Sequence, residues 1–345
     1  MVRSGRVESG VMRKRCWLPL GAILLVAQVA ADIQQEWVFR GTSNVFTLCR
    51  TATFDPEGNV FIGGGDFGEN IVDGWVMKLD RSGKLLWKTA RGRLEATKAL
   101  LDSEGNLLVW SRDRTGPEAD DLSKISPSGA VLRSLRYENA ASEGSFHPLD
   151  FAADPQGNIY VTGGSIGNGW QTIKYNRDWQ SQWVRQEEDS EAFLDVPHSV
   201  AITSQGKVVV CGVRREGWEV VVYNQIGQKE KALRITAEQP LSAPQLKEDR
   251  LGNWYVGGGI SGGMYVVRLD TNGEIMWRAR TPESNFSHDF VGFDLDGSGK
   301  TVLWARGYRR DYDTVVAAFD SDGNELWFHS VDEGCLLYTS DAADE

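Results

Sequence analysis

Cysteine is scarce in this sequence. Only four occur in 345 residues, and two of them, Cys16 and Cys335, lie near the ends of the chain. Such spacing excludes the dense disulfide framework that holds small secreted domains together. We expect Cys49 and Cys211 to be small buried hydrophobic side chains, and we expect the fold to rest on a hydrophobic core, which a chain of this length can form.

Recognisable catalytic and metal-binding patterns are also few. The chain has four histidines, and none belongs to a His-Glu-x-x-His zinc motif. The segment "DLDGSGK" (294–300) begins like a calcium loop, but its twelfth position is Ala305 rather than glutamate, so it is typical of a turn. We therefore expect no metal and no cofactor, and the sequence names no reaction.

A surplus of basic charge is absent as well. The net charge is −11 at pH 7, which disfavours nucleic acid as a partner, because nucleic acid requires a basic surface. We expect a monomer whose partner is a protein, a peptide or a carbohydrate.

Long apolar runs are confined to the first 31 residues. "MRKR" (12–15), the apolar segment that follows and "VAA" (29–31) match the three regions of a signal peptide over residues 1–31. The run is short for a membrane anchor, which needs about 20 residues. We expect a secreted or periplasmic protein without a membrane span in its mature chain. Both Met1 and Met12 remain possible starts.

The last eleven residues, Cys335–Glu345, fit no repeat. They resemble the conceptual translation of a sequencing-library adapter, and we expect them not to belong to the natural protein.

What the sequence does have is one phrase repeated six times. "DPEGNVFIGGG" (55–65) and "DPQGNIYVTGG" (154–164) are nearly identical, and their turn glycines recur at intervals of 46 to 52 residues. A period in this range indicates a repeat array such as a propeller. The six turn glycines are Gly58, Gly105, Gly157, Gly206, Gly252 and Gly299.

Each unit divides into four short strands. In the first unit we predict strands at 46–54, 60–64, 75–80 and 84–89, separated by Gly-rich turns and rich in β-branched and aromatic residues. Four strands per repeat predict an all-β fold, a β-propeller of four-stranded blades over residues 45–334. We expect the tryptophans that recur in the fourth strands to pack between blades: Trp87, Trp183, Trp277 and Trp327.

The number of blades is open. Residues 34–40 ("QQEWVFR") match a fourth strand without three preceding strands, and Trp37 lies 50 residues before Trp87. An N-terminal strand at 32–44 would then complete the last blade and close the ring, which predicts six complete blades and a truncated seventh. A six-bladed ring with a spare strand is the alternative.

The segments "DPEGNVFIGGG" and "GWVMKLDRSGKLLW" resemble the bacterial SBBP repeat, a seven-bladed β-propeller family. The similarity covers about residues 45–331; units two and four lack the tryptophan. Kelch repeats are a weaker match. The resemblance implies an exported propeller and does not fix a function.

Candidate site residues fall near the starts of the first strands. His147, His198 and His288 each lie there, and we predict that they share one structural position at the mouth of the central channel. Imidazoles and carboxylates at a channel mouth could bind a ligand or act as a general base. The accompanying carboxylates are Asp150, Asp195 and Asp289.

Trp75, Trp170 and Trp218 follow a glycine at the start of the third strands. Exposed on a rim, they would suit stacking on a sugar or peptide; alternatively, they pack beneath their own loops. Two functions thus remain open: a binding or interaction module with a ligand site at the channel mouth, or a propeller enzyme, a lyase or hydrolase, that uses the histidines.

Overall fold

The computed structural model describes residues 46–68, 72–113, 119–138, 146–165, 169–187, 196–214, 217–236, 244–282, 288–307 and 314–331. These residues form six four-stranded antiparallel sheets, each made of four consecutive strands. No helix occurs in these ranges, and none of the described segments contains a helix that could cross a membrane. The prediction of an all-β chain with six four-stranded blades is confirmed.

The blades follow the order of the sequence. Blade one contains β1 (Phe46–Phe54), β2 (Val60–Phe67), β3 (Val72–Leu79) and β4 (Leu85–Gly92). Blade two contains β5 (Leu94–Leu101), β6 (Leu107–Asp113), β7 (Ala119–Ile125) and β8 (Val131–Glu138). Blade three contains β9 (Phe146–Ala153), β10 (Ile159–Ser165), β11 (Gly169–Tyr175) and β12 (Ser181–Glu187).

The second half repeats this plan. Blade four contains β13 (Val196–Ile202), β14 (Val208–Arg214), β15 (Gly217–Tyr223) and β16 (Lys229–Thr236). Blade five contains β17 (Gln245–Glu248), β18 (Trp254–Ile260), β19 (Gly263–Leu269) and β20 (Ile275–Arg280). Blade six contains β21 (His288–Leu295), β22 (Thr301–Gly307), β23 (Thr314–Phe319) and β24 (Glu325–Val331).

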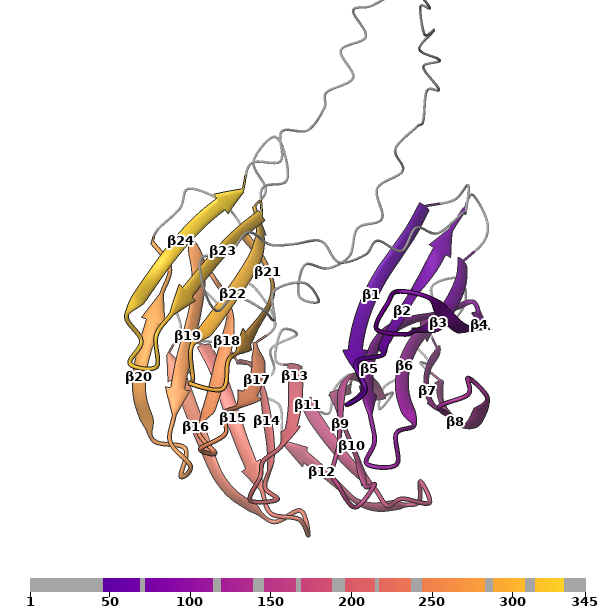
Figure 1. Ribbon diagram of the computed structural model, residues 1–345. Helices are drawn as coiled ribbons and strands as arrows, with labels where there is room; N and C mark the ends of the chain where they lie inside the picture. Colours follow the sequence, from indigo (N-terminus) through magenta and orange to yellow (C-terminus); the bar gives the residue numbers. More distant parts are fainter. Residues whose placement is uncertain are drawn as a thin grey trace, which may run out of the picture.

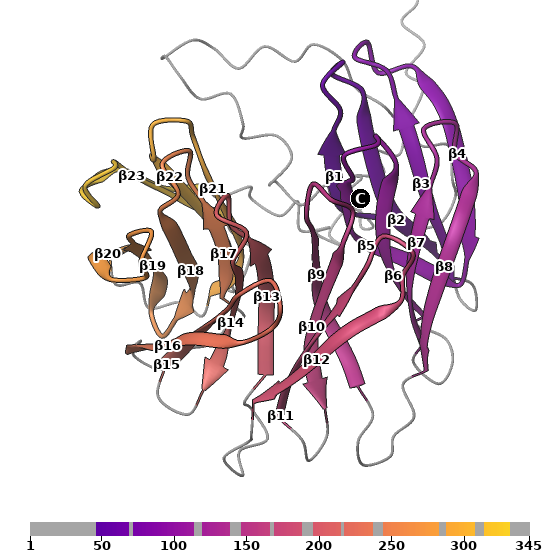
Figure 2. The same cartoon turned by 90° about the horizontal axis from the view of Figure 1, so that it is seen from below.

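The six blades succeed one another around an arc, with blades one and six at its two ends (Figures 1 and 2). The first strand of each blade is innermost, and neighbouring first strands such as β9 and β13 contact each other. The fourth strand forms the outer rim, where exposed residues alternate with half-buried ones, as in β4. The signal peptide expected at 1–31, the strand expected at 34–40 and the C-terminal tail at 335–345 lie outside the described residues.

The repeated Asp-x-x-Gly-Asn phrase is a hydrogen-bonded turn between the first and second strands. In blade three the backbone N–H of Gly157 donates to the Asp154 carbonyl at 3.0 Å, and the Asp154 side chain accepts from the backbone N–H of Asn158 at 2.8 Å. Glycine is required because φ is 83° at Gly157. The asparagine side chain completes the turn by donating to the second carboxylate oxygen at 2.7 Å.

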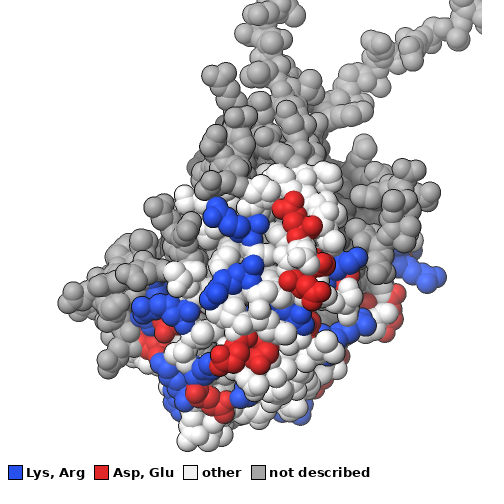
Figure 3. Space-filling view, turned by 90° about the vertical axis from the view of Figure 1, so that its left-hand side faces the viewer, with Lys and Arg blue, Asp and Glu red and all other residues white. Residues whose placement is uncertain are grey.

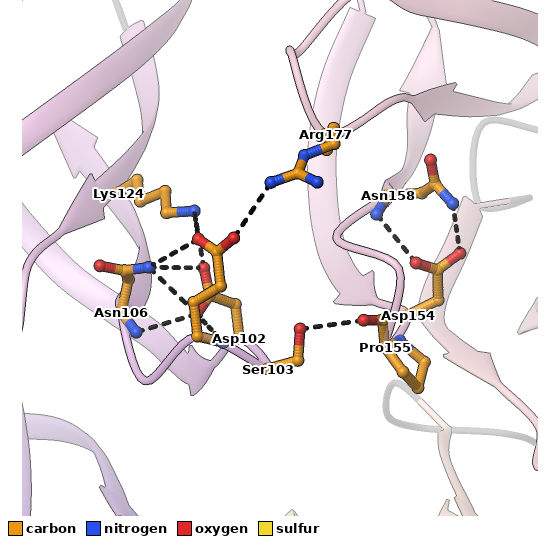
Figure 4. A network of polar contacts seen from close by, with 9 residues as sticks. Asp102, Ser103, Asn106, Lys124, Asp154, Pro155, Asn158 and Arg177 are labelled. Atoms are coloured by element: carbon orange, nitrogen blue, oxygen red, sulfur yellow. Dashed lines mark hydrogen bonds and ion pairs between the residues drawn. The ribbon is translucent and has the colours of Figure 1, made fainter.

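These turns also join neighbouring blades. The hydroxyl of Ser103, in the turn of blade two, donates to the carbonyl of Pro155 in the turn of blade three at 2.9 Å (Figure 4). Arg177 of blade three lies 3.1 Å from the Glu104 carboxylate of blade two. The tight-turn face is therefore a continuous layer of short, internally bonded connections.

The hydrophobic core lies between blades. Five clusters of buried side chains each combine residues of two consecutive blades, as in the packing of Val209 and Val220 of blade four against Leu246 and Val256 of blade five. Alternate residues of a strand face opposite neighbours, so each blade contributes one apolar face to each side.

The outer tryptophans fasten blade one to blade two, blade three to blade four and blade five to blade six. The indole N–H of Trp183 donates to the carbonyl of Gln225, the second residue of the next blade's turn, at 3.1 Å. Its ring covers the glycine of that turn: a Cβ on Gly227 would lie 2.8 Å from the ring. Trp87 bonds to Pro127 and Trp277 to Ser321 in the same way, both at 2.9 Å. We call this arrangement the tryptophan clamp. Its position confirms for Trp87, Trp183 and Trp277 the prediction that these residues pack between blades. For Trp327 of β24 it stays a prediction, because no described blade follows blade six.

The boundary between blades two and three carries a reversed clamp. Arg133 replaces the tryptophan, and Trp179 replaces the turn glycine of the next blade with a φ of 60°. The Arg133 guanidinium lies 5.9 Å from the centre of the Trp179 ring and donates to the Asp178 carbonyl at 2.6 Å. This boundary therefore keeps both an aromatic ring and a hydrogen bond to the turn. Here the turn of blade three supplies the ring, and the fourth strand of blade two supplies the donor.

Charge on the outer rim is mixed. Figure 3 shows basic and acidic side chains interspersed over the side of the molecule that carries the rim of the later blades. Lys207 and Glu230, for instance, lie 2.6 Å apart and are both more than a third exposed. Exposed pairs of this kind contribute about 0–1 kcal/mol each.

Candidate functional site

The innermost strands share a β-bulge. The pairing register between first and second strands shifts at one position in blades one, two, three, four and six. In each case the bulged residue lies eight residues before the turn glycine, so the repeat fixes its place. These residues are Arg50, Thr97, Leu149, His198 and Val291.

The bulged residues are more exposed than the residues around them. Leu149 is 36% exposed, whereas Asp150 beside it is 7% exposed; Arg50 is exposed beside buried Cys49. A bulge redirects a side chain and bends its strand, and the free edge of a first strand borders the central channel. The five bulged residues, a mixture of polar and apolar side chains, thus share one register position on the innermost strands of five blades, and we call them the bulge ring.

In blades one to four, the side chain of the residue after the bulge ties the inner strands together. The hydroxyl of Thr51 accepts the backbone N–H of Ala99 at 2.9 Å, and Asp150 accepts the N–H of Val200 at 2.9 Å. The Ser199 hydroxyl accepts the N–H of Leu246 at 3.4 Å. These hydrogen bonds satisfy backbone donors on the neighbouring blade that no strand pairs, and they hold the bulge ring in place.

Asp150 was predicted as a ligand-binding carboxylate at the mouth. Instead it is buried between blades, where it receives the Lys98 ammonium from blade two and the N–H of Val200 from blade four. Lys98 also donates to the Phe151 carbonyl at 2.9 Å. A buried carboxylate that already has two partners is an inter-blade bridge, so the prediction that it lies open to a ligand is wrong.

His198 belongs to the bulge ring and is partly exposed. Burial lowers the pKa of His198 to about 4, and the nearby Asp150 carboxylate only partly opposes this effect. The imidazole is therefore neutral at pH 7. In this state one ring nitrogen donates and the other accepts a hydrogen bond, which suits recognition of a polar ligand.

The three histidines do not share one structural position. His198 lies at the bulge, His147 pairs with Gly164 nearer the start of β9, and His288 pairs with Gly307 at the first residue of β21. Counted from the turn glycines, their positions differ by up to three residues, or about 10 Å along a strand. That part of the prediction is wrong. Asp195 and the side chains of His147, His288 and Asp289 lie outside the described residues.

The three rim tryptophans are buried. Trp75 is 3% exposed, Trp170 1% and Trp218 0%. Trp218 lies over the next blade, where a Cβ on Gly258 would be 2.6 Å from its ring, and Trp170 covers Gly212 in the same way at 2.8 Å. The paired glycines of the repeat thus make room for a tryptophan of the preceding blade. The interpretation as an exposed rim is wrong, because these rings belong to the core.

The two cysteines are structural. Neither forms a disulfide, and both are buried, as predicted. Burial raises the pKa of the Cys211 thiol, with a further contribution from the Asp150 charge, so this thiol stays protonated. Among the described residues, no group of three His, Cys, Asp or Glu side chains could hold a metal ion.

No known family profile matches the sequence, and no curated protein matches it either. Solved structures do match, at low sequence identity.

The propeller of Dos1 superposes with a TM-score of 0.56 at 11% identity, covering 82% of this chain and 70% of that chain. A protein from Lactobacillus plantarum gives a TM-score of 0.54 at 16% identity, covering 79% and 82%. Sqt1 from Chaetomium thermophilum, bound to the N-terminus of ribosomal protein L10, gives 0.52 at 13% identity, covering 81% and 86%. At these identities the likeness concerns the fold, and the chain has the fold of a β-propeller.

Proposed function

We propose that this protein is an exported β-propeller of the SBBP type that works as a binding module, and that it binds an extended peptide or protein segment at the channel mouth. The observation that carries the proposal is the difference between the two faces. On one face every described connection is a tight turn closed by its own hydrogen bonds. On the other face, the connections that join consecutive blades from blade two onward are longer, as between Glu138, where β8 ends, and Phe146, where β9 begins, whereas hairpins such as that between Ile260 and Gly263 are short. Longer loops on a rigid scaffold commonly carry binding function.

The chemistry of the bulge ring favours a peptide over a sugar. The tryptophans that could have stacked on a sugar ring are buried in the core. The ring offers instead a neutral imidazole at His198, the half-exposed Leu149 and the guanidinium of Arg50. Arg50 lies 2.6 Å from the buried Glu95 carboxylate, which fixes its direction. Polar and apolar groups in alternation suit the backbone and side chains of an extended peptide.

The solved complex of Sqt1 with the N-terminus of ribosomal protein L10 gives a precedent for a propeller that binds a protein segment. It supports the class of partner proposed here and says nothing about the sequence of the partner. The protonated, buried thiol of Cys211 is unsuited to nucleophilic chemistry.

The test is selection of binders from a phage-displayed library of random peptides. We expect peptides selected on the full chain to lose binding to the variant that carries His147→Ala, His198→Ala and His288→Ala. A matched control carries Glu57→Ala and Gln156→Ala, two exposed residues of the tight-turn face, and should bind as the parent does. If the tight-turn variant loses binding and the histidine variant keeps it, the assignment of faces is reversed.

A further inference from the structure

One apolar cluster differs from the other five because it belongs to a single blade. It contains Cys49, Val60, Ile62, Trp75, Met77 and Leu79, all from blade one. The alternate residues Phe61 and Val76 point to the other side of the sheet, where they pack against blade two. The cluster therefore covers the face of blade one that is turned away from blade two, at the end of the arc (Figure 2).

Blade six presents a corresponding face at the other end. Val315, Ala317 and Phe319 pack against blade five, so the alternate residues Val316 and Ala318 face away from it. Both are nevertheless buried, at 7% and 3% exposure. Apolar faces thus lie at both ends of the arc, and no strand of another described blade packs on either of them.

Comparison of equivalent positions in blades four and one indicates which side chain could pack on this face of blade one. In blade four, Val208, Val210, Val221 and Tyr223 pack against Trp183, the clamp tryptophan of blade three. Measured from the turn glycines Gly58 and Gly83, the same four positions in blade one are occupied by Val60, Ile62, Met77 and Leu79. Blade one therefore carries the receiving half of a tryptophan clamp.

The chain contains a tryptophan that could complete this clamp. Trp37 lies in "EWVFR", 50 residues before Trp87, in the sequence context of a fourth strand. We propose that residues 34–40 form the outer strand of a seventh blade docked on the face of blade one that is turned away from blade two, with Trp37 as its clamp. By analogy with Trp183, the ring packs on Leu79 and Gly83, and the indole N–H donates to the carbonyl of Arg81, the second residue of the turn.

This proposal is independent of what binds at the channel mouth. Its consequence is that the N-terminal segment and blade one form a blade boundary like the interior ones. Residues 34–40 of the same chain then cover the apolar face of blade one, so that this sheet has a neighbour on both sides.

A double-mutant cycle in the full chain tests it. Trp37→Ala should lower the urea midpoint of unfolding by an amount comparable to Trp183→Ala, and its effect should be non-additive with Leu79→Ala. Glu36→Ala is the matched control, because the equivalent Gln182 of blade three is exposed, and it should leave the midpoint unchanged. Trp37→Ala combined with Tyr223→Ala, in a distant blade, should be additive.

The milder pair Trp37→Phe and Leu79→Val serves the same cycle where the alanine variants do not fold. An unchanged midpoint in the Trp37 variants, or strict additivity with Leu79, would overturn the proposal. Slow exchange of the Trp37 indole proton, similar to that of Trp183, is the second expected result; rapid exchange would contradict the hydrogen bond to Arg81.

Discussion

His198 shows how the position of one residue in the fold decides its chemistry. It lies at the bulge of β13, next to Ser199, which accepts a hydrogen bond from blade five. Burial lowers the pKa of His198 to about 4, against the pull of Asp150. A histidine that titrates at this pH in the folded chain is a neutral hydrogen-bonding group at physiological pH.

The lowered pKa predicts a pH dependence of stability. Between the ordinary pKa of about 6.5 and the folded value of about 4, the unfolded chain binds a proton that the folded chain does not. Stability should therefore be fully present above pH 6.5 and fall as the pH drops toward 4, by about 3 kcal/mol at most.

Urea unfolding across this pH window measures the effect. His198→Gln should flatten the slope, whereas His329→Gln, at an exposed position of β24, should leave it as in the parent. An identical slope in the His198→Gln variant would show that another group carries the dependence.

At the scale of elements, the turns and clamps account for most of what the sequence repeats. The Asp of each tight turn accepts hydrogen bonds from its own turn, and these bonds are what the Asp-x-x-Gly-Asn phrase encodes. The clamp extends the same turns across the blade boundary. The acceptor of the turn can change, since in blade four the Thr203 hydroxyl accepts the backbone N–H of Lys207 at 3.1 Å.

The reversed clamp between blades two and three predicts a compensated pair. Trp179→Gly removes a side chain from a left-handed backbone position, but it leaves Arg133 without its aromatic partner. Arg133→Trp alone places two large rings at one boundary. The double variant restores the common clamp, so we expect it to be at least as stable as the parent, with a favourable coupling of about 1–3 kcal/mol.

Denaturant unfolding of the two single variants and the double variant gives this coupling directly. Additive effects would mean that Arg133 and Trp179 are independent substitutions rather than an exchanged pair.

The strands of the first unit illustrate what the sequence could predict. The first strand was predicted at 46–54 and is observed there, whereas β2 and β3 run to Phe67 and from Val72, beyond the predicted 60–64 and 75–80. The hairpin is longer because its glycines and aspartates pair across the strands, as Gly65 does with Gly74. Propensity alone assigned these residues to a loop.

The site was harder to predict for a specific reason. The histidines were aligned by the starts of their strands, but register is set by distance from the turn glycine, which places them at different depths. Counting from that glycine would have found the bulge ring. The burial of Trp218 and Trp170 is accompanied by glycines on the next blade, Gly258 and Gly212, where a Cβ would lie 2.6 and 2.8 Å from the rings; at Gly212 the backbone of β13 lies closer still.

At the scale of the whole molecule, the two faces of the propeller have different tasks. One is a layer of short turns linked from blade to blade, as between Ser103 and Pro155. The other holds the connections between consecutive blades, which from blade two onward are longer than those turns. Asp150 and Lys98 stabilise the inner strands that carry the bulge ring. Their ion pair joins blades two and three, and Asp150 also accepts the backbone N–H of Val200 in blade four. A rigid ring under variable loops is the arrangement expected of a binding module.

Hydrogen–deuterium exchange of the full chain, with and without a peptide selected on it, tests this assignment of the binding face most directly. We predict that the peptide slows exchange in the early residues of the first strands, around Leu149 of β9 and His198 of β13, while the turns at 55–59 and 154–158 exchange as they do without it. Protection confined to those turns, with none in the first strands, would contradict the account.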